Sequence, residues 1–269
     1  MCAIQYGCQT YTWQMSYEKY SQRLDHIIDV VAESGFAGIE SEVCMLGPYN
    51  EDPVRLAGDM QAKGLALAAI CLVCDWLSPQ ETPEELTEAD RVIAMLQTHF
   101  PGTLLALCQM PQADRSDLQA RQDNCIACSN AIGRRAADSG VRTAFHPNSP
   151  EGSVFRIAED YKILMDSLDT SVVGFAPDAG HIAKGDMDPV AIFQEYGPTI
   201  QHVHFKDMRQ DGTWAEMGQG CIDFDAIVNG LKAHDYQGWI MVEDESPRAE
   251  IDPDAVTRAN GEYLKVRFK

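Results

Sequence analysis

Eight short apolar runs divide the chain into units of similar length, and they constrain its fold more than any other feature. The runs recur roughly every 30 to 35 residues, with segments of helical periodicity between them. Eight strand–helix units in 269 residues are typical of a TIM barrel, a fold of about 250 residues. We therefore predict an α/β fold in which residues 1–269 form a single (β/α)8 TIM-barrel domain. In chain order the runs are IQYGCQ, FAGIES, LALAAICLV, TLLALCQ, VRTAFHP, SVVGFAPD, IQHVHFKD and GWIMVED.

The main alternative is a doubly wound parallel sheet, which usually has fewer such units and a Gly-rich phosphate loop. The sequence shows no loop of that kind. Helix-start signals support this division into strand–helix units. Thr82 fits an N-cap, Pro83 the first helical position and Glu85 the third helical position. Other helix starts are predicted at the Asp-Pro pairs 52–53, 188–189 and 252–253, and helix ends at Gly35, Gly64 and Gly140.

Charge and composition exclude several classes of protein. The formal net charge of -20 repels phosphate backbones and anionic lipids, so we expect neither nucleic acid nor a membrane as a partner. No apolar stretch approaches the roughly 20 residues of a membrane span, and the first residues lack the pattern of a secretion signal. Nine cysteines spread along the chain fit free thiols in a reducing compartment, so we expect a cytoplasmic protein.

Two CxxC pairs, Cys71 with Cys74 and Cys125 with Cys128, raise the alternative of a structural zinc site. The first pair lies on a predicted strand, where an odd separation directs the two thiols to opposite faces. The second pair lies within a predicted helix beside small apolar residues, as buried cysteines do. We therefore interpret these cysteines as core residues.

Polar side chains gather where the predicted strands end, which is the end of a TIM barrel that carries chemistry. Residues two apart on a strand share a face. We expect three such faces to point into the barrel: Gly174, Ala176 and Asp178; His202, His204 and Lys206; and Trp239, Met241 and Glu243. His146 ends the preceding strand and is able to join them. Uncompensated charges would be costly to bury there, and a divalent metal ion would compensate them.

Each of these residues also has an ordinary structural interpretation. Asp178 by itself fits a helix N-cap, an inward histidine such as His204 fits a hydrogen-bonded core residue, and Glu243 fits an ion pair. The joint occurrence on four successive strand ends favours a metal-binding or catalytic cluster over these separate interpretations.

Several segments resemble the xylose-isomerase-like TIM-barrel superfamily of sugar isomerases and epimerases, and most closely its inosose dehydratase branch. The matching segments are FHPN, FAPDAGHIAKGDMDP, IQHVHFKD, MGQGCIDFDAIV and GWIMVEDE, which cover the C-terminal half. The first half is similar mainly in its strand rhythm. The resemblance implies one divalent metal ion, manganese first and cobalt, iron, zinc or magnesium as alternatives. It implies Asp178, His204 and Glu243 as ligands.

His146 stands where the superfamily usually has a fifth-strand glutamate, and a neutral imidazole is a ligand for manganese, cobalt, iron or zinc. We expect His146 either to complete the metal site or to act as a base beside it, with Glu243 as the other candidate base. His181 and Lys206 are expected to hold substrate oxygens, Lys206 also steadying an enolate. Glu40, Trp76 and Asn148 are predicted to line the sugar pocket.

The resemblance implies a metal-dependent enzyme that enolises a keto-sugar or keto-cyclitol, with isomerisation or epimerisation as the first outcome. A dehydratase that eliminates a β-hydroxyl or glycosyl group is an alternative, and so is a non-catalytic sugar-binding barrel or a subunit of a larger complex. A relative that cleaves DNA at abasic sites is disfavoured by the charge of -20. Barrels of this family often form dimers, so a homo-oligomer is a further alternative. In it, Trp214 would close the mouth of the barrel in a neighbouring copy.

Overall fold

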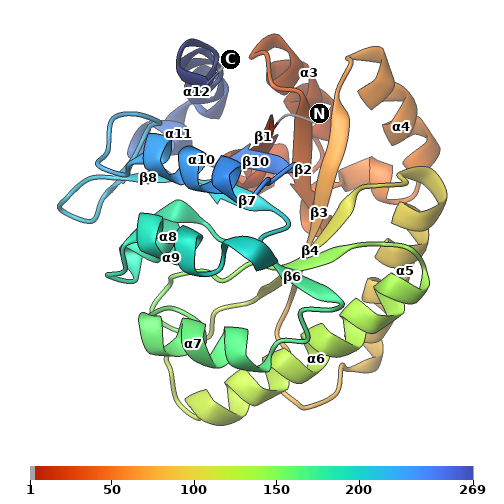
Figure 1. Ribbon diagram of the computed structural model, residues 1–269. Coiled ribbons are helices and arrows are strands. Elements are labelled where there is room, and N and C mark those ends of the chain that lie inside the picture. Colours follow the sequence, from red (N-terminus) through yellow and green to blue (C-terminus); the bar gives the residue numbers. More distant parts are fainter. Residues whose placement is uncertain (1–3, 269) are drawn as a thin grey trace.

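The computed structural model describes residues 4–268. It is a cylinder of eight parallel strands surrounded by helices (Figure 1). Neighbouring strands follow the order β6-β5-β4-β3-β2-β1-β10-β7, and every pairing is parallel. This architecture confirms the predicted TIM barrel. The eight strands are β1 (Gln5–Gln9), β2 (Gly38–Glu42), β3 (Ala66–Cys74), β4 (Leu104–Gln109), β5 (Thr143–Phe145), β6 (Val173–Phe175), β7 (Val203–Phe205) and β10 (Trp239–Val242).

The cylinder closes between β6 and β7 through two isolated parallel bridges, one between Phe175 and Ile200 and one between Asp178 and His204. The backbone N–H of Gln201 donates to the carbonyl of Phe175 at 2.9 Å, and that of His204 donates to Pro177 at 2.9 Å. The second bridge sets Asp178 beside His204 through the backbone alone, before any side chain contributes.

Helices cover the outside of the cylinder, and the last one, α12, packs against α3 near the N-terminal strand (Figure 1). The α-helices are α1 (Tyr11–Gln14), α2 (Tyr17–Tyr20), α3 (Leu24–Glu33), α4 (Pro53–Ala62), α5 (Pro83–His99), α6 (Leu118–Asp138), α7 (Ala158–Ser167), α8 (Ala179–Lys184), α9 (Pro189–Glu195), α10 (Phe224–Ala233), α11 (Pro247–Ile251) and α12 (Pro253–Phe268). Short 3-10 turns are η1 (Val43–Met45), η2 (Gly47–Asn50) and η3 (Gly197–Thr199), and a small hairpin joins β8 (Asp207–Met208) to β9 (Trp214–Ala215).

Helix termini follow the local signals in the sequence. Thr82 and Glu85 form a reciprocal capping box, in which Glu85 N donates to Thr82 Oγ1 at 3.2 Å and Thr82 N donates to Glu85 Oε2 at 2.8 Å. Gly35, Gly64 and Gly140 have φ values of 79°, 68° and 72°, the left-handed conformation that glycine adopts at a helix end. These predictions are confirmed. The segment 17–35 has the apolar periodicity of one helix, but it is interrupted at residues 21–23 and forms α2 and α3.

Two apolar cores flank the strands. A large core fills the space between strands and helices, whereas a small one of mostly Ala and Cys side chains lies inside the barrel. Cys71 belongs to the inner core and Cys74 to the outer core, as the strand periodicity predicts. Small inner side chains leave volume inside the barrel that Glu40, His202, His204 and Lys206 occupy, all at most 1% exposed. Within residues 4–268 no helix combines the length and apolarity that crossing a membrane requires.

Candidate metal centre and substrate cavity

Four side chains that follow successive strands converge at the C-terminal mouth of the barrel. His146 follows β5, Asp178 follows β6, His204 belongs to β7 and Glu243 follows β10. Each offers one ligand atom, and these four atoms all lie within 4.8 Å of one another in buried surroundings. The structure thus brings together the four residues that we predict as metal ligands.

One carboxylate oxygen of Asp178 caps a helix, and the other has no hydrogen-bond partner. Its Oδ1 accepts a hydrogen bond from the backbone N–H of His181 at 2.7 Å and so caps α8. Its Oδ2 is buried and has no hydrogen-bond partner. A carboxylate oxygen left in this state is costly unless a ligand pairs with it, so Oδ2 is available to a cation.

His204 is oriented by a carboxylate on its far side. Its Nε2 lies 3.0 Å from Oε2 of Glu40, and a carboxylate only accepts, so Nε2 carries a hydrogen. The other ring nitrogen, Nδ1, has no hydrogen-bond partner and lies 3.5 Å from Oε2 of Glu243. Neighbouring carboxylates of this kind are the usual supports of metal-binding histidines, because they direct the second nitrogen toward the ion.

His146 presents a neutral imidazole to the cluster. Its Nδ1 lies 3.2 Å from the carbonyl oxygen of Ala176, which accepts the hydrogen on that nitrogen and leaves Nε2 with its lone pair. Burial, with a smaller effect from His204, lowers the pKa of His146 to about 3. The ring is therefore in the form that binds a metal ion at neutral pH.

Burial and mutual attraction set the protonation of the other ligands. Burial raises the pKa of Asp178 to about 6. Burial opposes the charged form of His204, but Glu40 and Glu243 outweigh it and raise its pKa to about 10. Lys206 and His204 likewise outweigh burial at Glu243 and hold its pKa well below the ordinary value. Two carboxylates and two imidazoles, with unpaired atoms on Asp178 and His204, fit a divalent ion, which would displace the proton on Nδ1 of His204.

Glu40 lies elsewhere than predicted. It is fully buried beneath the cluster, where its Oε2 is 2.6 Å from Nε2 of His202 and 3.0 Å from that of His204. His202 occupies the deeper layer that its place on the strand predicts. Both histidines point inward from the β7 segment, which β1 and β10 separate from β2. Glu40 therefore pairs with them across the barrel interior and does not line the sugar pocket.

Lys206 is buried between two glutamates beside the cluster. Its Nζ lies 2.5 Å from Oε1 of Glu243 and also pairs with Glu245. On its other side, Nζ is 3.2 Å from Nε2 of His181, whose Nδ1 is 2.7 Å from the hydroxyl of Ser149. Because an ammonium group only donates, Nε2 of His181 accepts and Nδ1 donates to Ser149. A continuous polar chain therefore runs along one wall of the mouth.

A cavity of about 460 Å³ opens above the cluster, within the range of small-molecule sites. Of the residues predicted to contact substrate, His181 and Asn148 line it, although the Asn148 amide already donates to the carbonyl of Gln109 at 2.9 Å. Trp76 does not line it: the side chain is 1% exposed and packs on Phe145, with ring centroids 6.5 Å apart. The prediction for Trp76 as a pocket residue therefore fails, because its ring turns outward into the helix–strand core.

Other lining residues were not predicted as site residues: Tyr11, Gln14, Glu42, Trp214 and Glu245. Glu42 lies two residues beyond Glu40 on the same face of β2 and so one layer nearer the mouth, a signal that the sequence contained. Burial raises the pKa of Glu42 to about 7. Trp214 contacts its own chain's cavity, edge-on to His181 at a centroid distance of 5.8 Å.

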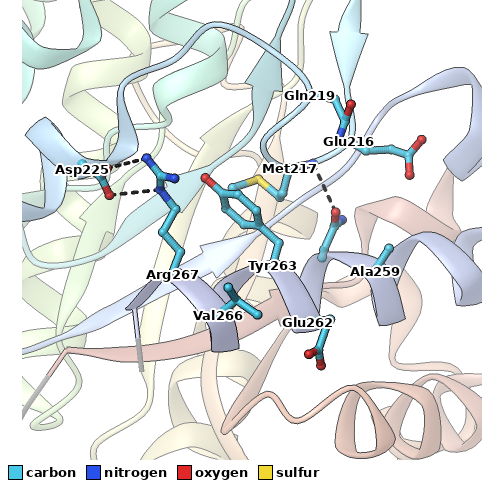
Figure 2. Close-up of a pocket in the computed structure, with 10 residues that line it drawn as sticks. Glu216, Met217, Gln219, Asp225, Ala259, Glu262, Tyr263, Val266 and Arg267 are labelled. Carbon is cyan, nitrogen blue, oxygen red and sulfur yellow. Dashed lines mark hydrogen bonds and ion pairs between the residues drawn. The ribbon is translucent and has the colours of Figure 1, made fainter.

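A larger cleft of about 770 Å³ lies on the outer side of the barrel, between the segment 216–219 and α12 (Figure 2). Several of its polar groups already have partners: Arg267 pairs with Asp225, and the backbone N–H of Met217 donates to Asn260 at 3.2 Å. No ligand atom of the metal cluster lines it. The cleft with the larger volume is therefore not the one beside the metal cluster. The smaller cavity, above that cluster, is the candidate active site.

Comparisons with known proteins agree with this fold. The family model described as "Xylose isomerase-like TIM barrel" matches residues 28–266. Inosose dehydratase of Bacillus velezensis is 27% identical over 264 residues, 86% of this chain and 84% of the relative. That of Clostridium beijerinckii is 31% identical over 156 residues, so this alignment spans 51% of the chain and only 52% of the relative.

Solved structures show the same architecture. A probable 3-DHS dehydratase from Bacillus anthracis superposes with a TM-score of 0.78 at 16% identity, covering 98% of this chain and 100% of that one. The IOLI protein, described with a binding zinc atom, superposes with a TM-score of 0.78 at 15% identity, covering 98% and 97%. At such identities the likeness is evidence of fold.

Proposed function

The chain belongs to the xylose isomerase-like TIM-barrel family, and from this premise we propose that it is a divalent-metal-dependent enzyme acting on a keto-cyclitol or keto-sugar. One observation carries the proposal. Four ligand atoms converge within 4.8 Å at the floor of a small-molecule cavity, and one of their carboxylate oxygens is buried without a partner. The zinc atom described for the IOLI protein, which has the same fold, supports the proposal of a bound metal.

The proposed holders of the ion are His146, Asp178, His204 and Glu243. When bound, a divalent ion polarises a substrate carbonyl and acidifies the neighbouring C–H group. Two imidazoles among four donors favour manganese, cobalt, iron or zinc over magnesium, which prefers oxygen. We propose manganese first.

The protein's own groups supply the proton transfers. Glu243 Oε1 and Glu245 lie on either side of the Lys206 ammonium, so one carboxylate is positioned to remove a proton and the other to return or relay one. Lys206 is fully buried and does not line the cavity, and its ammonium group already pairs with Glu243, Glu245 and His181, so it positions these three side chains and does not hold a substrate oxygen as the sequence predicts. His181, held between Ser149 and Lys206, presents a fixed ring to the cavity.

We place dehydration first among the outcomes, with loss of a β-hydroxyl after removal of the α-proton. The supporting observation is that the relative from Bacillus velezensis, which aligns over 84% of its length, is an inosose dehydratase. The second candidate is isomerisation or epimerisation, which we expect first from the sequence alone. It begins with the same proton removal.

The test is an NMR screen in D2O of 2-keto-myo-inositol and a panel of ketoses, with metal-free protein before and after addition of manganese. We expect metal-dependent loss of water from the inosose together with deuterium exchange. Asp178→Asn should abolish both. Asp188→Asn is the matched control, because Asp188 caps α9 through its Oδ1 and lies outside the metal cluster. Full turnover without metal, or by Asp178→Asn, would refute the proposal.

A further inference from the structure

Glu42 lines the cavity above the metal cluster, and the mechanism proposed above does not use it. The four proposed metal ligands belong to β5, β6, β7 and β10, which are neighbours in the closed barrel, or directly follow them. Three strands separate β2 from β6 in either direction, so Glu42 at the end of β2 lies across the barrel from Asp178. A substrate that fills the cavity therefore lies between the ligand cluster and Glu42.

Glu42 is the one carboxyl group on its half of the cavity. Among the described lining residues that come from β1 to β4 or from the segments after them, the others have amide, phenol, thiol or apolar side chains. The amide of Gln14 donates to Oε2 of Glu42 at 2.8 Å, and the thiol of Cys44 lies 3.6 Å from the same oxygen. Neither contact engages Oε1 of Glu42, which is left for a group of the substrate.

The surroundings of Glu42 favour its uncharged form. The titratable groups that face it are Glu40, Glu243, Tyr11, Cys44, Cys71 and Cys108. The two glutamates oppose a further negative charge, and burial raises the pKa values of the phenol and the three thiols, which keeps them neutral. Because burial also raises the pKa of Glu42 to about 7, roughly half of this carboxyl carries a proton at neutral pH.

Dehydration needs a proton at the departing oxygen, because hydroxide is a strong base and leaves slowly. A positioned acid speeds such a step by roughly 10²- to 10⁴-fold. Glu243 and Glu245 both pair with the Lys206 ammonium, which favours their ionised form, so they suit removal of the α-proton. We propose that Glu42 is the catalytic acid that protonates the leaving β-hydroxyl from the side of the cavity opposite the ligand cluster. This inference rests on the proposed function for the reaction that Glu42 completes.

Every proton and electron pair of this step is accounted for by groups at the site and by water. Removal of the α-proton by Glu243 or Glu245 leaves an electron pair that the carbonyl oxygen shares. This pair forms the new carbon–carbon double bond as the C–O bond breaks, and the departing oxygen takes the proton of Glu42 and leaves as water. Glu42 then regains a proton from solvent, and the base returns to solvent the proton that it removed.

Two rates measured on one sample test this role. In D2O with manganese, NMR follows both deuterium exchange at the α-carbon of 2-keto-myo-inositol and loss of water from it. Glu42→Gln keeps the shape of the side chain but has no acidic proton, so the ratio of water loss to exchange should fall at least about 100-fold. The ratio cancels any loss of folded protein. Glu88→Gln should keep the wild-type ratio and is the matched control, because Glu88 pairs with Arg91 and does not line this cavity.

Two further measurements separate an acid from a residue that only shapes the cavity. An inosose analogue with fluorine in place of the departing hydroxyl loses fluoride, a far weaker base than hydroxide that needs little protonation. Glu42→Gln should release fluoride from it at close to the wild-type rate. Infrared difference spectra of the metal-free proteins at about pH 6, wild type minus Glu42→Gln, should show the C=O band of a protonated carboxyl group.

The outcomes distinguish this inference from the proposed function. Equal losses of exchange and water loss in Glu42→Gln, slow fluoride release or a missing carboxyl band would each overturn the acid role while metal-dependent turnover by the wild type stands. Exchange without water loss in the wild type would indicate an isomerase or epimerase and would also overturn the acid role, because no hydroxyl leaves. A wild type that shows neither exchange nor water loss would refute the proposed function, and the acid role with it.

Discussion

Replacement of Glu40 by glutamine tests whether the buried carboxylate beneath the cluster prepares His204 for the metal ion. In the wild type, one Glu40 oxygen lies 2.6 Å from Nε2 of His202 and 3.0 Å from Nε2 of His204. The Glu40→Gln side chain has a single acceptor oxygen and no charge. The amide oxygen is able to accept from both histidines, as Oε2 of Glu40 does, but without the negative charge it holds the Nε2 hydrogen of His204 more weakly.

The expected effect follows from the loss of this support. Removing the outer partner of a metal-binding histidine typically lowers metal affinity by 10- to 100-fold, or about 1.4 to 2.7 kcal/mol. Loss of the charge from these two buried hydrogen bonds should also destabilise the metal-free protein by roughly 1–3 kcal/mol. Both effects should appear in Glu40→Gln, the first in manganese and zinc titrations and the second in thermal unfolding.

Glu42→Gln is the matched control, because Glu42 shares the face of β2 but bonds to Gln14 and to neither histidine. Its metal affinity should stay within about threefold of wild type, well short of the tenfold loss expected for a supporting carboxylate. NMR of 15N-histidine in the zinc-loaded protein should show the hydrogen of His204 on Nε2 in the wild type. Wild-type metal affinity in Glu40→Gln, with that hydrogen still on Nε2, would refute the positioning role.

Three further predictions concern stability and metal binding. Asp178→Asn keeps an oxygen to cap α8 but removes the charge, so metal-free thermal stability should hold while metal content, measured by mass spectrometry, falls from about one ion per chain toward zero. The pKa of Glu42 is about 7 in the folded protein against an ordinary 4.5, so its charging should cost up to about 3 kcal/mol as pH rises from 4.5 through 7. Glu42→Gln should therefore gain stability over wild type at pH 8 but not at pH 4.5 in urea titrations of metal-free protein. Asp254→Ala should leave the buried Trp13 Nε1 without its 2.8 Å partner and cost about 1–3 kcal/mol, whereas Asp254→Asn should recover most of it; equal losses in the two variants would contradict this.

The sequence sufficed for the barrel and for the faces of residues in register with the strands, although not for Trp76 in the turn after β3. Eight apolar runs at near-constant spacing leave few alternatives to eight strand–helix units, and each run corresponds to a barrel strand. Parity along a strand is a local property with a period of two residues. Asp178, His204 and Glu243 were therefore assignable to the interior, and Cys71 and Cys74 to opposite sides, without knowledge of any neighbour.

The depth at which each inward side chain lies along the barrel axis could not be predicted from strand periodicity. Glu40 and Glu42 share a face, and the pairing of β2 with β3 shifts register between Ile39 and Glu40, so their heights relative to other strands depend on a non-local irregularity. Trp76 lies in the turn after β3, where the two-residue periodicity of the strand predicts nothing. Its φ is 45°, and its ring packs outward against Phe145. Trp214 reaches the cavity through the hairpin of β8 and β9, whose position its own residues do not specify.

The chain by itself thus determined how many strands close the barrel and which side chains face its axis, because strand periodicity and helix-end chemistry are encoded within a few residues. Only the tertiary structure decided which of those inward side chains meet at one height, since height depends on the register between strands far apart in the sequence. That register places Glu40 under His204 as its support and leaves Glu42 in the lining of the cavity above the metal cluster.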